Sequence, residues 1–379
     1  MLRNEVNKRF CFLTEFYDPS ATLVRRYQVF YYPSDGAIEI YDPKNNRIFL
    51  KRIQLPTISF KDLYKGNEVN IFSRLHKIVE YGDDYTRKYF EKTRSTTYGM
   101  IKPDGYMNIG KIIDMIYNAG HFTIVKLKLC KMSLENAAEF YGEHKGKPFY
   151  DFLVNYITSD FIVGMELVKK DAIAAWRNFI GPTNVAKAKA EAPNSLRGIF
   201  GNGEKNTVHG SDSPQSVIRE CNIVFNKIIH KPMLTNCACL VIKPHAISEG
   251  NAGKIIDIIL TEGFEISSMQ MFYLDKINAE EFFEVYKGVL PEYSEMIEDI
   301  TCGPVIAMEV RQDDCVNKLR ALVGPHDPEI AKSLRPNTIR AKFGFDRVRN
   351  AVHCTDLSED GPLECKFFFE DLAYSLLPH

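Results

Sequence analysis

Residues 10 to 60 alternate aromatic or β-branched side chains with polar ones, as in "YQVFYYPSDGAIEIYDPKNNRIFLKR". A period of two is typical of strands that bury one face. Asp35-Gly36 and Asn45-Asn46 separate the strand-like runs, and such residue pairs favour tight hairpin turns. The first block of the chain is therefore predicted to be a β-rich module.

The alternation stops at a charged stretch, "YGDDYTRKYFEKTRS", which covers residues 81 to 95. Solvated charge without an apolar period indicates a connector between domains. We place the boundary near residue 92, so the first domain is predicted to span residues 1–92.

Beyond this boundary the pattern changes to strand, turn and helix. The strand-like "TTYGMI" precedes the turn "KPDG" and the segment "MNIGKIIDMIYNAG", where Gly120 ends the predicted helix. Four isoleucines share one face of that helix. They are Ile109, Ile112, Ile113 and Ile116.

The same order recurs from residue 237, with "CACLVI", "KPHA" and "EGNAGKIIDIILTEGF". The second helix has its own apolar stripe, formed by Ile255, Ile256, Ile259 and Leu260, and it ends at Gly263. Matching residues keep a steady offset: 141 positions between Lys102 and Lys243, and 143 between Arg177 and Arg320. We infer two copies of one α/β domain, a first copy over residues 93–229 and a second copy over 236–371.

Composition narrows the classes of partner. The chain has 379 residues, of which 45% are hydrophobic and 26% charged, with a formal net charge of −1. This balance gives no global attraction to nucleic acid or to a membrane surface, and we expect neither as a partner. The longest uncharged apolar run, "FIVGM", is far shorter than the roughly 20 residues that span a bilayer.

The nine cysteines are an odd number, and the N-terminus has no secretory apolar segment. We therefore expect reduced thiols in a cytosolic compartment. Cys237 and Cys239 form a close pair, but no second pair stands at the spacing of a zinc site. They are interpreted as buried apolar residues, and no protein metal site is expected.

Each copy places one histidine three residues after an asparagine and three before an aspartate, in "NTVHGSDSP" and "NAVHCTDLS". Neutral imidazole has a lone pair near pH 7 and can carry a phosphoryl group. A hydroxyl and a glutamate follow each histidine by two and eleven residues and could hold the ring in one tautomer. An isolated histidine of this kind is usually structural, but the repeated surroundings of His209 and His353 favour chemistry.

Each copy also holds one lysine at a strand end and two arginines, and an aromatic residue follows the lysine by about fifty positions. Such cations suit a polyphosphate, and the aromatic ring could stack on a base. The chain has no GxxxxGK[ST] pattern, and the glycine-rich "GIFGNGEKN" lacks the strand-to-helix context of a dinucleotide site. Phosphate is therefore expected to be held by side chains.

The motif "NxxHxSD", preceded by "IKPDG", resembles the nucleoside diphosphate kinases, and the resemblance covers both copies. It implies two α/β sandwich domains of ferredoxin-like topology that bind nucleoside tri- and diphosphates together with Mg²⁺. It also implies a reaction in which the histidine takes the γ-phosphoryl group from a nucleoside triphosphate and gives it to a nucleoside diphosphate.

For the first copy the resemblance implies that His209 is phosphorylated and that Ser211 and Glu220 orient it. Phe149 would stack on the base, and Tyr141 would support the histidine region. The implied nucleotide contacts are Lys102, Tyr141, Phe149, Arg177, Thr183, Arg197 and Asn206. One departure is the loop "TNVAKAKAEAPNSLR", which is about three residues longer than the family's usual spacing.

For the second copy it implies His353 as the reactive residue, oriented by Thr355 and Glu364. The implied nucleotide contacts are Lys243, Tyr293, Arg320, Arg340 and Asn350. Four positions depart from the family pattern, because His245 and Ala246 replace Asp-Gly, His326 stands where a threonine is usual, and Thr355 replaces the serine. We expect this copy to bind nucleotide and to transfer phosphate more slowly.

The first block resembles the DM-ten module, a PH-like fold of ciliary and axonemal proteins, through "EFYDPSATLVRRYQVFYYPSDGAIEIYD", "IFLKR", "VNIFSR" and "EYGDDYT". This resemblance implies a location in the cytoplasm and cytoskeleton, on the ciliary axoneme. Tubulin and other axonemal microtubule proteins would be the partners. The alternative to a phosphotransferase is a structural microtubule inner protein whose kinase folds are docking bodies.

Basic side chains of this block, Arg25, Arg26, Lys51 and Arg52, could face acidic tubulin, or they could form an ordinary solvated hairpin face. Tyr31 and Tyr32 could likewise be exposed anchors or core residues. The sequence leaves both questions open.

Overall fold

The computed structural model describes residues 9–18 and 20–375, and its contacts divide the chain into two compact units. The first unit holds the chain up to Thr93 together with Tyr273–Pro304. The second holds Arg94–Phe272 and the chain from Val305 onward. The division cuts across the sequence repeat, because Tyr273–Pro304 lies inside the second copy.

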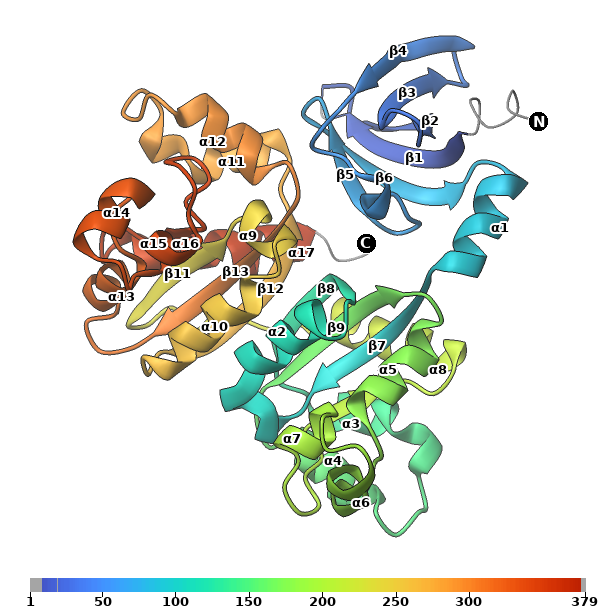
Figure 1. Cartoon of the computed structure of the whole chain (residues 1–379), viewed down its shortest axis with the longest axis vertical. Coiled ribbons are helices and arrows are strands. Elements are labelled where there is room, and N and C mark those ends of the chain that lie inside the picture. Colours follow the sequence, from blue (N-terminus) through green and yellow to red (C-terminus); the bar gives the residue numbers. More distant parts are fainter. Residues whose placement is uncertain (1–8, 19, 376–379) are drawn as a thin grey trace. The chain divides into compact units, whose positions relative to one another are not determined.

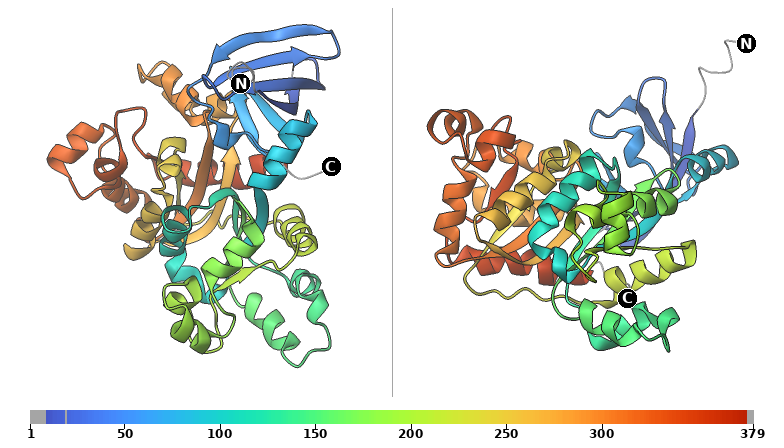
Figure 2. Two further views of the ribbon diagram at one scale, coloured as in Figure 1. Left: turned by 45° about the vertical axis from the view of Figure 1, so that its right-hand side comes forward. Right: turned by 60° about the horizontal axis from the view of Figure 1, so that its bottom comes forward.

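The N-terminal block forms an antiparallel six-stranded sheet in the order β4-β3-β2-β1-β6-β5, curled into a half-barrel (Figure 1 and Figure 2). Its strands are β1 (Phe10–Asp18), β2 (Leu23–Tyr32), β3 (Ala37–Asp42), β4 (Arg47–Gln54), β5 (Glu68–Ile71) and β6 (Arg74–Tyr81). Gly36 and Asn46 adopt positive φ angles of 69° and 50° in the two tight turns. The predicted β-rich, PH-like module and its hairpins are therefore confirmed.

The charged stretch after β6, interpreted from sequence as a connector, forms a helix, α1 (Asp84–Thr93), and this helix packs on the N-terminal module. Phe90 is 0% exposed, and its ring centroid lies 5.2 Å from that of Tyr81 and 5.5 Å from that of Phe12. A short helix needs few buried side chains to pack on a domain. Because this helix is otherwise charged, its sequence shows no apolar period that would predict the contact. A 3₁₀ turn, η1 (Phe60–Asp62), adds a further ring to the same core.

The rest of the first unit is α11 (Lys276–Phe282), the 3₁₀ turn η5 (Glu284–Tyr286) and α12 (Tyr293–Ile300). Asn70 on β5 donates a hydrogen bond of 3.0 Å to the carbonyl of Thr301, the residue that ends α12. The N-terminal sheet thereby caps a helix that belongs to the second copy by sequence.

The first copy interleaves strands and helices as predicted. Its sheet has the strand order β10-β7-β9-β8, which is the ferredoxin-like arrangement and confirms that expectation. The elements are β7 (Ser95–Ile101), η2 (Pro103–Asn108), α2 (Ile109–Asn118), β8 (Thr123–Cys130), α3 (Leu134–Phe140), η3 (Gly142–His144), α4 (Tyr150–Ile157), β9 (Ile162–Lys169), α5 (Ala172–Ile180), α6 (Val185–Glu191), α7 (Leu196–Phe200), β10 (Val208–Gly210), α8 (Pro214–Cys221) and the π-helical turn η4 (Asn222–Lys227).

The second copy repeats this order, and its sheet runs β12-β13-β11-β14. Its elements in the second unit are β11 (Cys237–Ile242), α9 (Pro244–Ser248), α10 (Ala252–Thr261), β12 (Glu265–Tyr273), β13 (Pro304–Arg311), α13 (Cys315–Val323), α14 (Pro328–Leu334), α15 (Ile339–Phe343), β14 (Val352–Cys354), α16 (Asp360–Lys366), the π-helical turn η6 (Phe367–Leu372) and α17 (Ala373–Ser375). The isoleucine stripes of α2 and α10 are buried, which confirms both predicted helix faces.

The two copies share one sheet of eight strands, because β8 pairs with β12 through Leu129 and Met269. The helices α2 and α10 cross with their backbones close together. A Cβ atom on Gly253 would stand 2.2 Å from the backbone nitrogen of Asp114, so only glycine fits there. Gly110 meets Asp257 in the same way.

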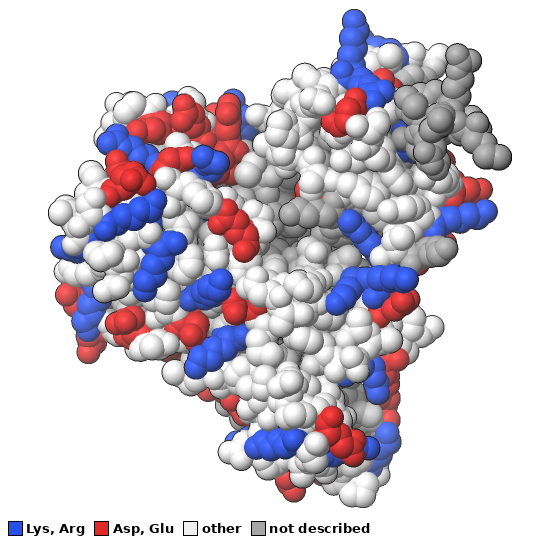
Figure 3. Space-filling view, in the orientation of Figure 1, with Lys and Arg blue, Asp and Glu red and all other residues white. Residues whose placement is uncertain are grey.

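Three further features bear on the expectations from sequence. All nine cysteines are free thiols. Among the described residues, no helix has the length and apolar character needed to cross a membrane. Lys and Arg side chains are interspersed with Asp and Glu over the face seen in Figure 3, as the near-zero net charge suggests.

Candidate active site

His209 lies at the centre of β10, opposite Met100 of β7. The indole nitrogen of Trp176 donates a hydrogen bond of 3.1 Å to its carbonyl, which fixes the backbone. The ring centroid of His209 lies 5.2 Å from that of Phe140 and 6.4 Å from that of Tyr141, and the His209 side chain is 19% exposed. The imidazole is therefore held on two sides and still reaches solvent.

A buried carboxylate selects the tautomer of this ring. Nε2 of His209 lies 3.0 Å from Oε2 of Glu220, and the Ser211 hydroxyl donates to the same oxygen over 2.5 Å. Because a carboxylate accepts hydrogen bonds, Nε2 carries the proton and the lone pair remains on Nδ1. Nδ1 is thus the nitrogen prepared for nucleophilic attack.

Lys102 is buried beside the histidine strand, and its ammonium donates a hydrogen bond of 2.8 Å to Oδ1 of Asn206. Burial and then the positive charge of Arg197 lower the pKa of Lys102 to about 8, while Asp104 acts in the opposite direction. An anionic ligand would stabilise the protonated form of Lys102 against both burial and the charge of Arg197.

Arg197 links the other binding residues to the histidine strand. Its guanidinium donates to the carbonyl of Val208 at 2.9 and 3.2 Å, to that of Gly181 at 2.8 Å and to the hydroxyl of Thr183 at 3.4 Å. Burial and the charge of Arg177 lower the pKa of Arg197 to about 10. A group of like charges in a partly buried place is the electrostatic signature of a polyanion site.

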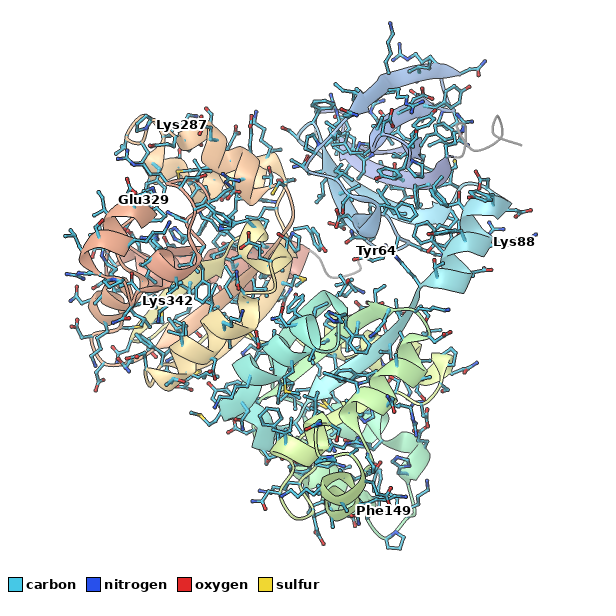
Figure 4. All side chains as sticks on the ribbon, in the orientation of Figure 1. Tyr64, Lys88, Phe149, Lys287, Glu329 and Lys342 are labelled. Atoms are coloured by element: carbon cyan, nitrogen blue, oxygen red, sulfur yellow. The ribbon has the colours of Figure 1, made fainter. Side chains whose placement is uncertain are left out.

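The remaining predicted residues lie at the rim. Arg177 and Thr183 are exposed, and the amide of Asn206 donates to the Thr183 carbonyl at 3.1 Å. Phe149 is 47% exposed, at the edge of the first copy in the segment before α4 (Figure 4). The ammonium of Lys147 lies 5.8 Å from its ring centroid. An exposed ring next to solvent suits stacking on a base.

Sequence reasoning missed a support beneath this site. Asp104 accepts hydrogen bonds from the hydroxyls of Tyr156 and Thr207, and Thr207 adopts a positive φ of 62° just before the histidine strand. Burial and the bond to Asp104 raise the pKa of Tyr156 well above its usual range. The aspartate stood in the "KPDG" motif, but its partners have no pattern in the sequence.

The second copy keeps the geometry of the reactive histidine. His353 lies on β14, with Nε2 3.1 Å from Oε1 of Glu364, and Thr355 donates to the other carboxylate oxygen at 2.6 Å. Arg340 donates to the carbonyls of Val352 and Gly324, as Arg197 does in the first copy. The contact with Glu364 fixes Nε2 as the protonated nitrogen of this ring as well.

The second copy differs in the groups that would meet phosphates. The ammonium of Lys243 donates to the carbonyl of Val348 at 2.6 Å, and the amide of Asn350 donates to the carbonyl of His326 at 3.2 Å. Arg320 forms an ion pair with Asp356.

His245 accepts a hydrogen bond of 3.2 Å from the backbone nitrogen of Ala351, which holds the turn before the reactive histidine. Burial, and then the charge of Lys243, lower the pKa of His245 to about 4. A neutral imidazole therefore stands where the first copy has the carboxylate of Asp104.

One predicted equivalence is wrong. Helix α4 begins at Tyr150 and α12 at Tyr293, so Glu292, not Tyr293, stands where the first copy has Phe149. Tyr293 lies in the first unit, whereas His353 lies in the second. The C-cap residues of α3 and α11 are likewise Tyr141 and Phe283, so the second copy lacks a hydroxyl at this position.

Comparison with known proteins agrees with this arrangement. The family model described as "Nucleoside diphosphate kinase" matches residues 95–228 and 236–373. A second model, described as "Nucleoside diphosphate kinase 7 N-terminal PH domain", matches residues 4–92.

Among curated relatives, nucleoside diphosphate kinase homolog 7 of Rattus norvegicus is 46% identical over 97% of this chain and 94% of its own length. The Mus musculus homolog 7 is 44% identical over the same shares. Among solved structures, a halophilic nucleoside diphosphate kinase from Halobacterium salinarum in complex with CDP is 34% identical. That match covers 35% of this chain and 88% of the other, with a TM-score of 0.33.

Proposed function

Because the chain belongs to the nucleoside diphosphate kinase family, we propose that its first copy transfers a γ-phosphoryl group from a nucleoside triphosphate to a nucleoside diphosphate through His209. The observation that carries this proposal is the hydrogen bond from Nε2 to Glu220, which leaves the lone pair on Nδ1. A histidine needs this tautomer to attack phosphorus through Nδ1.

In the proposed reaction, Nδ1 of His209 forms a bond to the γ-phosphorus while the bond to the bridging oxygen breaks. The nucleoside diphosphate leaves, and a second diphosphate takes the phosphoryl group in the reverse step. Glu220 stabilises the ring as it gains positive charge, and Lys102, Arg177 and Arg197 balance charge on the phosphate oxygens. Mg²⁺ would enter as part of the nucleotide substrate, since the protein lines this site with cations and not with metal ligands.

The test uses the full chain and radiolabelled ATP. We expect an acid-labile, base-stable phosphohistidine on His209, and its label should pass to an added nucleoside diphosphate. No labelled protein under conditions where nucleotide binds would overturn the proposal.

For the second copy we propose nucleotide binding with slower transfer. The oriented His353 supports transfer, whereas the ion pair of Arg320 with Asp356 and the replacement of threonine by His326 weaken phosphate binding. One lost charged hydrogen bond is worth about 1.5–3 kcal/mol, or roughly ten- to a hundredfold in rate. The test is the rate of labelling of His353 in a His209→Ala chain.

We also propose that the chain works on the microtubules of the ciliary axoneme, with the N-terminal module as its attachment. The support is the match of this module to the N-terminal domain of a specialised kinase homolog and its exposed edge strand β4. Ile48 and Ile53 of that strand are exposed large apolar side chains, and Lys51 is exposed between them. An edge with apolar and basic groups suits an extended or acidic protein partner.

The basic residues expected at this face are mostly used within the module. Arg25 pairs with Asp18, Arg26 with Glu15, and Arg52 with Asp35, which leaves Lys51 the stronger candidate. Tyr31 is buried, so it is a core residue, and the guanidinium of Arg52 covers the ring of Tyr32.

Retention on detergent-extracted axonemes tests the attachment. The full chain should be retained, Lys51→Glu combined with Ile53→Glu should wash away, and His209→Ala should remain bound. If the double variant is retained as well as the wild type, the attachment lies elsewhere. Loss of ciliary function in the double variant but not in His209→Ala would favour the architectural alternative over catalysis.

A further inference from the structure

A buried group of sulfur and carboxylate side chains lies in the second copy, below its reactive histidine. The ligand atoms of Cys237, Glu309 and Cys365 lie within 4.8 Å of one another, and all three residues are buried. Within the described part of the chain, this is the one group of three or more His, Cys, Asp or Glu residues close enough to hold a metal ion.

The fold explains how residues distant in sequence meet here. Cys239 on β11 pairs with Glu309 on β13, and residues opposite each other in a sheet point to the same face. Cys237 is two residues away on β11 and shares that face. The helix α16 packs on β11 and brings Cys365, whose thiol hydrogen-bonds with both strand thiols.

In the first copy, the glutamate equivalent to Glu309 has a lysine as its ion-pair partner. There the equivalent glutamate, Glu166, forms an ion pair of 2.9 Å with Lys126. In the second copy, the matching stretch of β12 holds Ser267 and Ser268 in place of a lysine.

Glu309 is 0% exposed, and its hydrogen-bond donors within the described residues are neutral. They are the Ser267 hydroxyl at 2.6 Å, the backbone nitrogens of Met233 at 2.9 Å and Leu234 at 2.7 Å, and the thiol of Cys237. A buried carboxylate without a positive partner is unfavourable, so a cation would stabilise this place.

We propose that the second copy binds one zinc ion through Cys237, Cys365 and Glu309, with Cys239, which hydrogen-bonds with Cys365, as a fourth donor. Two sulfurs and a carboxylate favour Zn²⁺ over Mg²⁺ or Ca²⁺, which prefer oxygen ligands alone. Binding would release the thiol protons of Cys237 and Cys365 to solvent, and the charge of the ion replaces the ammonium that Lys126 supplies in the first copy.

The site is connected to the reactive histidine through the residue that precedes Cys365. Cys365 directly follows Glu364, which holds Nε2 of His353, and the backbone nitrogen of Cys239 donates to Thr355 at 2.8 Å. The ion would fix α16 against β11 and β13, and so hold the carboxylate that orients His353.

Metal content of the untagged full chain tests this inference. After expression with zinc supplied, the wild type should retain about one zinc per chain, as a tetrahedral structural site does. Cys237→Ser combined with Cys365→Ser should retain close to none. The matched control is Cys221→Ser, the counterpart of Cys365 in the first copy, which should keep the full content.

A second measurement does not depend on whether the double variant folds. The wild type, stripped of metal and given Co²⁺, should develop the absorption of cobalt bound to thiolates, and Glu309→Gln should bind it at least several-fold more weakly. Zinc should also raise the midpoint of thermal unfolding of the stripped wild type. A wild type that retains no zinc and takes up no cobalt, or one that forms a Cys237–Cys365 disulfide in air in place of binding metal, would overturn the inference.

Discussion

The first and second copies share one fold and one arrangement of histidine, hydroxyl and glutamate, yet they differ in the groups around it. His209 and His353 have the same nitrogen held at 3.0 and 3.1 Å by a carboxylate. Arg177 and Arg320 are both exposed to solvent, but Arg320 forms an ion pair with Asp356. In this domain, the residues that orient the nucleophile are therefore separate from the residues that bind the phosphates.

A nearby side chain favours the ion pair in the second copy. In the first copy Asp212 accepts a hydrogen bond of 2.8 Å from the hydroxyl of Ser216. The second copy has Asp360 at the serine position, which can only repel Asp356, and Asp356 turns to Arg320.

The two copies also differ in the hydrogen bonding of the asparagine that precedes the reactive histidine. In the first copy Oδ1 of Asn206 accepts from Lys102, whereas Oδ1 of Asn350 is buried and has no hydrogen-bond partner among the described residues. Such an atom typically destabilises a site by about 1–3 kcal/mol. A ligand that donates a hydrogen bond to Asn350 would recover part of this free energy.

The largest expected effect is that of removing the nucleophile. His209→Ala should lower the kcat of the full chain by about ten- to a hundredfold, to the level of the second copy, and His209→Ala combined with His353→Ala should lower it by about 10⁴- to 10⁶-fold, as loss of a covalent catalytic residue does. Nucleotide affinity should change little, because the imidazole is not a phosphate-binding cation. His353→Ala is the matched control and should leave most activity; an equal loss in the two variants would show that the copies contribute alike.

Removing the orienting carboxylate should have a smaller effect. Glu220→Gln cannot hold Nε2–H with a negative charge, and we expect phosphorylation of His209 to slow by about 10- to 100-fold. The rate of phosphohistidine formation in single turnover measures this, with Glu364→Gln in the second copy as the comparison. If the rate of phosphohistidine formation were unchanged and only nucleotide binding were weaker, Glu220 would have a structural role and would not orient His209.

The pH dependence of nucleotide binding should identify Lys102. Its pKa is lowered to about 8, and an anionic ligand binds the protonated form better. Affinity should therefore be constant below about pH 8 and fall above it, by up to about tenfold per pH unit. Lys102→Arg stays charged through this range and should remove the break. A break at the same pH in that variant would assign it to another group.

The smallest effect concerns the second copy. Asp356→Asn should release Arg320 and raise nucleotide affinity by about two- to fivefold, since an exposed ion pair is worth less than about 1 kcal/mol. Binding is best measured in a His209→Ala chain by protection of residues 350–355 from hydrogen exchange. Asp212→Asn is the matched change in the first copy and should give no gain. A gain in both copies would exclude the ion pair as the cause.

The sequence by itself determined the repeat, the helix stripes of α2 and α10, the hairpins of the N-terminal module and the histidine motif. These are local patterns, since periodicity and turn residues act within a few positions. It also placed the hydroxyl and glutamate that orient each ring, because a short strand and the helix after it bring residues two and eleven positions away to one point.

Only the tertiary structure decided the rest. One buried ring, Phe90, turned a charged connector into a docked helix, and the matching starts of α4 and α12 put Glu292, not Tyr293, at the position equivalent to Phe149. Asp104 and Tyr156 meet across 52 residues, and Cys365 of α16 meets Cys237 of β11. Such contacts depend on how elements pack at long range, and packing leaves no periodic signal in the chain.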